Sequence, residues 1–289
     1  MMRPRTRQAL AILATAAALC GAWTWAARRP GMTAEFAEHN QAANRVRIEG
    51  YLARPSAPAH VLVGSSLSGR LLPSYFEGTP MADVATLGLD GSGPRVGIEV
   101  LRRRKDWPET VWVETYLMGR ETTPNDRALM GDMDATGTRL AVAMPLFRAS
   151  HRPSSVAYTA LKRRREGGGG DATWTTNAAA SMRGPSAAPA PVDPGVEEAW
   201  HGLLEDLRRR NVRVVFVDVP AGETQRPGVR AQPDLADRLA VRFGIVRVDV
   251  REAWFSRGWV PRYTDGRHLD AASARQTARW LAEMAGEAR

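Results

Sequence analysis

Short apolar runs alternate with longer amphipathic segments along most of this 289-residue chain. The runs are rich in valine and are bounded by turn-forming residues, which predicts five strands, at 60–64, 84–87, 110–113, 212–217 and 245–249. Between them, apolar positions recur at three- and four-residue spacing, which predicts helices at 96–103, 125–165, 196–210, 233–243 and 270–285. Strands that alternate with helices predict an α/β domain whose mostly parallel five-stranded sheet is covered on both faces.

The N-terminal segment has a different pattern, because it is apolar without alternation. Residues 9–27 carry no charge, follow three arginines within residues 1–7 and end at Arg28 and Arg29. As a helix this stretch is about 28 Å long, enough to cross a hydrocarbon core. We therefore predict a signal anchor over residues 1–30, single-pass in the inner (cytoplasmic) membrane, with the C-terminal domain in the periplasm or extracytoplasmic space. The alternative is a cleaved signal peptide, since Ala16–Ala18 offers small residues to a peptidase.

Composition shifts divide the rest of the chain. Residues 31–57 are polar and partly amphipathic, with a proline-rich end, and predict a membrane-proximal linker helix. The folded domain is predicted to span residues 58–289. Within it, the segment at about 166–194 is rich in glycine, alanine and proline, which predicts a low-complexity insertion.

Charge and cysteine usage exclude several function classes. The net charge of +9 comes almost wholly from arginine, because Lys105 and Lys162 are the only lysines. No basic stripe is interleaved with aromatic residues and no zinc-finger spacing occurs, so we expect no nucleic-acid partner. Cys20 is the only cysteine, which excludes a disulfide framework and a cysteine metal site. We expect no metal and no cofactor.

A serine turn follows the first predicted strand. Gly64 interrupts the apolar run, and the residues after Ser66 fit the start of a helix. A serine at such a turn lies at the edge of a sheet, near helix amides that can face an anion, which suits a nucleophilic hydroxyl. The alternative is that Ser65 or Ser66 only caps the helix. The glycine-rich turn after the second strand lacks the spacing of a dinucleotide fingerprint and the Gly-Lys-Ser/Thr of a P-loop.

An acid and an imidazole occur together in the loop before the last helix. Asp265 lies three residues before His268, so one turn can deliver both groups. Imidazole suits a general base that activates a serine, and a carboxylate can fix its tautomer. Asp270 is expected to cap the last helix. The alternative is an ordinary turn at Asp265 and Gly266 with a surface histidine.

These motifs, Gly64-Ser65-Ser66, Leu87-Gly88-Leu89-Asp90-Gly91 and Asp265-x-x-His268, resemble the SGNH/GDSL hydrolase superfamily. The likeness is to its membrane-anchored members, which act in O-acetylation of cell-surface polysaccharides. The resemblance implies a flavodoxin-like three-layer sandwich. It also implies Ser66 as nucleophile, His268 as base, Asp265 as its orienting acid and the Gly88 amide in the oxyanion hole.

The chain departs from that family at its third motif, Gly-x-Asn-Asp. Glu114–Leu117 occupies this place, with Tyr116 where the asparagine stands. The hydroxyl of Tyr116 or Thr115 is one replacement donor for the oxyanion hole; the alternative is that the amides of Ser66 and Gly88 suffice. An α/β-hydrolase elbow is excluded because Gly69 falls one residue too late.

The resemblance implies serine-dependent O-acyl transfer, of acetyl in particular, through an acyl-Ser66 intermediate. The acceptor is an extracytoplasmic polysaccharide, or water if the protein hydrolyses an ester. It also implies a multi-spanning membrane O-acyltransferase as a partner that carries acyl groups outward. The alternative is a catalytically impaired accessory or glycan-binding protein that keeps the fold.

Overall fold

The computed structural model describes residues 4–27, 29, 34, 37, 39–167, 192–219, 221–222 and 233–287. The predicted insertion at about 166–194 lies outside these ranges except at its two ends. The first arginine of the N-terminal segment and Arg28 lie outside them as well.

Five parallel strands form a single sheet, as the apolar runs predict. They are β1 (His60–Gly64), β2 (Val84–Gly88), β3 (Thr110–Glu114), β4 (Arg213–Asp218) and β5 (Val246–Asp249), in the order β2-β1-β3-β4-β5. Every pairing is parallel, and the register sets Gly64 beside Gly88. The strands β1, β2 and β3 are buried along their whole length, which explains their continuous apolar runs. Their carboxyl ends meet at one edge, where ligands bind in sheets of this kind.

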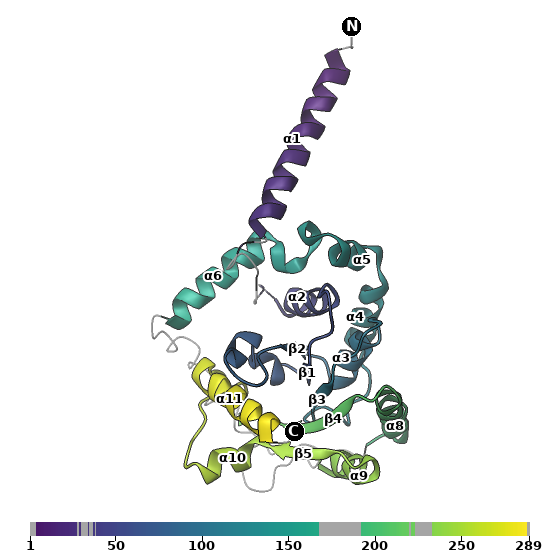
Figure 1. Cartoon of the computed structure of the whole chain (residues 1–289), viewed down its shortest axis with the longest axis vertical. Coiled ribbons are helices and arrows are strands. Elements are labelled where there is room, and N and C mark those ends of the chain that lie inside the picture. The colour runs from purple at the N-terminus through teal and green to yellow at the C-terminus, as the bar shows by residue number, and fades with distance from the viewer. Residues whose placement is uncertain are drawn as a thin grey trace.

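Helices cover the sheet and extend beyond it (Figure 1). They are α1 (Pro4–Ala27), α2 (Asn40–Leu52), α3 (Pro94–Leu101), α4 (Pro124–Asp134), α5 (Thr136–Ala143), α6 (Pro153–Gly167), α8 (Pro194–Arg209), α9 (Pro233–Phe243), α10 (Val250–Ser256) and α11 (Ala271–Glu287). Successive strand residues point to opposite faces, so Val61 and Val63 enter one hydrophobic cluster and Leu62 enters another. The first cluster is completed by α2, α3, α4, α8 and α9, and the second by α10 and α11.

The helix α1 projects away from the rest of the molecule (Figure 1). Residues Thr6–Ala26 are long and apolar enough to span a membrane, and none of that span is buried. Its lower end is tied to the domain, because the Trp23 indole nitrogen donates a hydrogen bond to the His151 carbonyl oxygen at 2.9 Å. The predicted N-terminal helix is therefore present, with the length and apolar character that a membrane span needs.

The helix α2 differs from the predicted linker. It begins at Asn40, and Ile48 and Tyr51 lie in the same hydrophobic cluster as the strands. The carboxylate of Glu49 is buried and accepts a hydrogen bond from the Ala149 amide at 2.6 Å. Its apolar face packs against the sheet, so α2 belongs to the core of the domain.

The helix predicted after Ser66 is replaced by two short 3₁₀ turns, η1 (Ser68–Arg70) and η2 (Pro73–Phe76). Glycine and proline explain this, because Gly69 weakens a helix and Pro73 cannot donate to one. The predicted helical region 125–165 is likewise divided, with η3 (Pro145–Phe147) and η4 (Ala149–His151) between α5 and α6.

Candidate active site

The turn that carries Ser66 is organised around the buried carboxylate of Glu114, the last residue of β3. One carboxylate oxygen, Oε2, accepts hydrogen bonds from the backbone amides of Ser65 at 3.0 Å and Ser68 at 2.9 Å. The other, Oε1, accepts the Ser65 hydroxyl at 2.5 Å. These three bonds fix the backbone on both sides of Ser66. Ser65 is thus held inward, whereas the hydroxyl of the neighbouring Ser66 lies against the His268 ring.

Burial raises the pKa of Glu114 above its ordinary value of 4.5, and the hydrogen bonds from Ser65 and Ser68 offset part of this rise. In the sequence, Glu114 stands at the start of the segment that replaces the third family motif. A signal for its role does exist in the sequence, because it is an acidic residue that directly continues a buried strand. Such a carboxylate needs internal hydrogen-bond donors.

The same end of the sheet is packed backbone against backbone. A Cβ atom on Gly88 would lie 2.1 Å from the Gly69 nitrogen, and one on Gly64 would lie 2.3 Å from the Ser68 hydroxyl oxygen. Only glycine allows this approach. The serine turn therefore rests directly on the ends of β1 and β2.

The serine and the distant histidine meet. The Ser66 Oγ lies 2.8 Å from His268 Nε2, and His268 Nδ1 lies 2.6 Å from Asp265 Oδ2. The carboxylate accepts only, so Nδ1 carries the ring proton and the Nε2 lone pair faces the Ser66 hydroxyl. The three residues predicted to be catalytic thus form one hydrogen-bonded chain. An alcohol, a base and an acid in this order can perform nucleophilic catalysis.

The loop that carries His268 is held by the Asp265 side chain and by contacts from outside the loop. Asp265 Oδ1 accepts the amides of Arg267 at 3.0 Å and His268 at 2.7 Å, and Gly266 adopts a left-handed φ of 76°. From outside, the Gly222 amide donates to the Arg267 carbonyl oxygen at 3.1 Å. The predicted cap at the following helix is present, since Asp270 accepts the Ser273 amide at 2.7 Å.

The electrostatics of this loop favour an ionised acid. Partial burial alone would raise the pKa of Asp265, but hydrogen bonds from the amide and ring of His268 and from the Arg267 amide outweigh it. They lower the pKa of Asp265 to about 2. The carboxylate therefore stays charged opposite the imidazole across the physiological range.

The predicted oxyanion-hole residues lie elsewhere in the site. The Leu89 amide donates to the Gly64 carbonyl oxygen at 2.9 Å and therefore points toward β1. Because successive amides along a strand point in opposite directions, the Gly88 amide points away from β1, toward the open edge of the sheet. The Tyr116 hydroxyl accepts a hydrogen bond from Arg267 Nη2 at 3.1 Å, which ties the end of β3 to the histidine loop. In the structure, Gly88 allows close packing against the serine turn, and Tyr116 contacts the histidine loop. Their roles in an oxyanion hole remain predictions.

One candidate donor remains at the nucleophile itself. Among the described residues, the Ser66 backbone amide has no hydrogen-bond partner, whereas the amides of Ser65, Leu67 and Ser68 are all bonded. An unpaired amide next to the nucleophilic oxygen is suited to a developing oxyanion.

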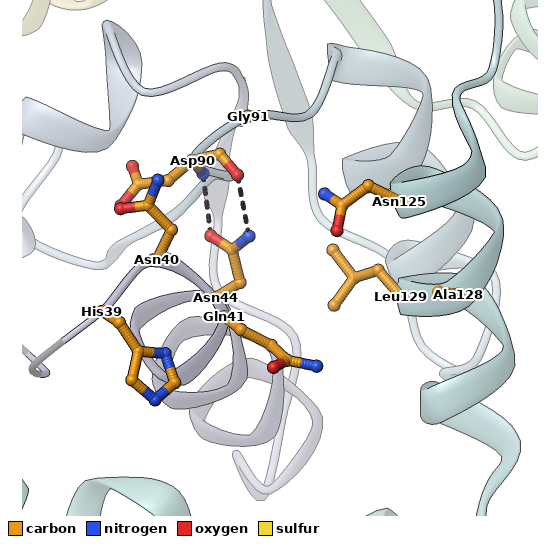
Figure 2. Close-up of a pocket in the computed structure, with 9 residues that line it drawn as sticks. All are labelled: His39, Asn40, Gln41, Asn44, Asp90, Gly91, Asn125, Ala128 and Leu129. Carbon is orange, nitrogen blue, oxygen red and sulfur yellow. Dashed lines mark hydrogen bonds between the residues drawn. The ribbon is translucent and has the colours of Figure 1, made fainter.

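A cavity of about 550 Å³ lies between α2, the turn after β2 and α4 (Figure 2). Its walls are rich in amides, with Asn125 and Leu129 projecting from α4 toward Asn44. The Asn44 side chain accepts the Asp90 amide at 2.7 Å and donates to the Asp90 carbonyl oxygen at 3.0 Å. No sequence motif marks this cavity, because its walls come from three separate segments.

An arginine connects the cavity to the serine turn. Arg47 pairs with the Asp90 carboxylate at 3.1 Å and donates to the Gly69 carbonyl oxygen at 3.4 Å. The cavity and Ser66 therefore share the same end of the sheet.

In the described ranges, no group of three or more His, Cys, Asp or Glu residues could hold a metal ion. No protein-family model matches the chain, and no curated protein matches it. The chemistry of the site therefore follows from its own geometry.

Proposed function

We propose that this protein is a serine-dependent O-acyltransferase or esterase of the SGNH/GDSL hydrolase type, acting through an acyl-Ser66 intermediate. The observation that carries the proposal is the hydrogen-bonded chain from Ser66 through His268 to Asp265. The strand order β2-β1-β3-β4-β5 supports a flavodoxin-like sheet, since flavodoxin-like folds have the order 2-1-3-4-5. Hydrophobic clusters on both faces support its three layers.

The first half of the reaction forms the acyl-enzyme. The Ser66 oxygen attacks the acyl carbonyl carbon while His268 Nε2 takes the hydroxyl proton, and the charged Asp265 stabilises the imidazolium. The tetrahedral intermediate then breaks its bond to the leaving alcohol, which receives the proton from His268. An ester of Ser66 remains.

The second half reverses these roles. A sugar hydroxyl attacks the Ser66 ester while His268 takes its proton, the bond to Ser66 breaks, and the serine oxygen recovers the proton. Water in place of the sugar gives hydrolysis. The Ser66 amide supports the oxyanion in both steps. Absence of the third-motif asparagine has a rate cost, since one lost donor typically costs ~10²–10³.

The acceptor follows from the cavity beside the serine turn. Amide side chains both donate and accept hydrogen bonds, which suits a ligand covered in hydroxyl groups. We therefore propose a polysaccharide acceptor, with the arginine-rich surface favouring an anionic one. The helix α1 supports membrane anchoring. We further propose that the membrane is the inner membrane, with the domain on the periplasmic side beside a multi-spanning membrane O-acyltransferase that supplies acyl groups.

Covalent labelling tests the nucleophile. The intact protein is treated with a serine-directed fluorophosphonate probe, and we expect one label that is lost in Ser66→Ala and kept in the matched variant Ser65→Ala. Folding of each variant is checked by circular dichroism. Absence of label on folded protein would refute the enzyme and favour the rival, an accessory or glycan-binding protein; the missing third-motif asparagine is the observation behind that rival.

A second experiment separates transfer from hydrolysis. The protein is given an acetyl ester with and without an oligosaccharide acceptor. Transfer yields an acetylated oligosaccharide, detected by mass spectrometry. Free acetate as the sole product with every acceptor would identify an esterase.

A further inference from the structure

The end of the domain from which α1 projects is formed by α5, η3, η4 and α6 (Figure 1). Three large apolar side chains are exposed there on successive turns: Leu140, Met144 and Phe147, each between 44% and 48% exposed. The turns are continuous, because the Met144 amide donates to the Leu140 carbonyl oxygen and the Phe147 amide to that of Met144. Exposed apolar side chains grouped in this way mark an interaction surface.

The charge of this segment has one sign. No acidic residue occurs between Asp134 and Glu166, whereas the stretch holds six arginines and one lysine. Arg139, Arg152 and Arg164 are exposed. Apolar side chains among cations suit the interface of an anionic bilayer, where the former enter the headgroup layer and the latter pair with phosphates.

The position of α1 determines how close this surface lies to the membrane that α1 would enter. The indole of Trp23 bonds to His151 in η4, and α1 also contacts η3, which contains Phe147. Trp25 is 61% exposed, and the Arg29 guanidinium lies 3.8 Å from the centre of its ring. Tryptophan and arginine at the end of a membrane helix lie at headgroup level. Phe147 therefore lies at the same level.

We propose that residues 139–164 form a docking surface for the anionic lipid bilayer that α1 enters. Leu140, Met144 and Phe147 insert into the interfacial layer, and the surrounding arginines contact lipid phosphates. The domain is thus held against the membrane in one orientation, with α1 and the docking surface as two points of attachment. This inference depends on α1 spanning the membrane and is independent of the chemistry at Ser66.

The expected gain from lipid charge is large. Each arginine near an anionic surface favours the docked state about fivefold. Removal of two arginines therefore lowers the ratio of docked to undocked protein about 25-fold. High salt is expected to weaken the same contacts.

Spin labels in the full-length protein measure the docking. On a Cys20→Ala background, a nitroxide is placed at Phe147→Cys and, as control, at Val241→Cys on α9, where the side chain is 85% exposed. The proteins are reconstituted into vesicles with and without phosphatidylglycerol. We expect the label at 147 to be several-fold less accessible to a water-soluble nickel relaxant than the label at 241. This difference should be larger in vesicles that contain the anionic lipid. Equal accessibility of the two labels in anionic vesicles would overturn the proposal.

Charge reversal separates lipid from protein partners. Arg139→Glu with Arg164→Glu should raise the relaxant accessibility at 147 toward that of the control label, whereas Arg208→Glu with Arg242→Glu on α8 and α9 should not. Protection at 147 that increases with the protein-to-lipid ratio would indicate a second copy of the chain as the occupant and refute the bilayer. A thermal melt of each variant confirms that it is folded.

Discussion

The two segments that meet at the site are organised by carboxylates in different settings. The serine turn is tied by three hydrogen bonds to the buried Glu114 and is packed backbone to backbone at Gly88. The histidine loop is tied to its own Asp265, whose side chain is 44% exposed, and its Gly266 backbone packs closely against Gly222. A substitution at the carboxylate that holds the serine turn is therefore expected to change the stability of the protein. A substitution at Asp265 is expected to change the rate with little effect on stability.

Removal of either reacting group should give the largest effect on activity. Ser66→Ala and His268→Ala are each expected to lower kcat by on the order of 10³–10⁶, because the two residues act as a unit. The double variant should be no slower than the singles. Hydrolysis of p-nitrophenyl acetate measures this, and a double variant with the product of the two single effects would show that the residues act independently.

The charge of Asp265 should matter for rate far more than for stability. Asp265→Asn is expected to lower kcat by about 10⁴, since the amide favours the wrong tautomer of His268. The unfolding free energy should change by no more than about 1 kcal/mol, because the asparagine oxygen still accepts the Arg267 and His268 amides. The pKa of Asp265 is lowered from its ordinary value of 3.8 to about 2. The stabilising contribution of the Asp265 carboxylate is therefore present above pH 3.8 and is lost as the pH falls through about 2. Urea titration and steady-state kinetics on one preparation check both parts.

Glu114 should show the opposite balance. Glu114→Ala leaves two buried amides and a hydroxyl without an acceptor, which is expected to lower the unfolding free energy by on the order of 3 kcal/mol. Glu114→Gln keeps one carbonyl oxygen for the two amides and should lower it by only about 1 kcal/mol. Chemical denaturation compares the two. Equal stability of Glu114→Ala and the native protein would remove the basis of the contrast between the two segments.

The raised pKa of Glu114 predicts a pH dependence of stability. A buried acid whose pKa is raised contributes stability that is fully present below 4.5 and is lost as the pH rises through the raised value. The native protein should therefore lose stability over that range, and Glu114→Gln should lose less. Melting temperatures between about pH 4 and pH 8 measure the difference; parallel curves would argue against an ionisable carboxyl there.

The last comparison is between one glycine of each segment. Gly266→Ala places a side chain at a left-handed φ of 76°, which costs about 1–2 kcal/mol. Gly88→Ala is the matched comparison, because there the new Cβ meets the Gly69 backbone and should cost more. Thermal melts of both variants rank the rigidity of the two segments.

The strands and the histidine loop could be predicted because their determinants are local. Valine-rich runs mark buried strands, and Asp265 and His268 share one turn. The sequence marks Glu114 as an acid that directly continues a buried strand, but its hydrogen-bond donors could not be predicted, since they come from another strand end. The packing of α2 was missed for a related reason: its apolar face is short and its charged residues, such as Glu49, are paired only in the folded domain. The cavity depends on three segments that only the fold brings together.

The separation of Ser66 and His268 by 202 residues has a consequence for biosynthesis. The chain is made from its N-terminus, so the serine emerges early and stays without its base until α11 has joined the sheet. Under the proposed mechanism, a nascent or C-terminally truncated chain therefore lacks the base that activates Ser66, and the acyl transfer can begin only after His268 has folded against the serine.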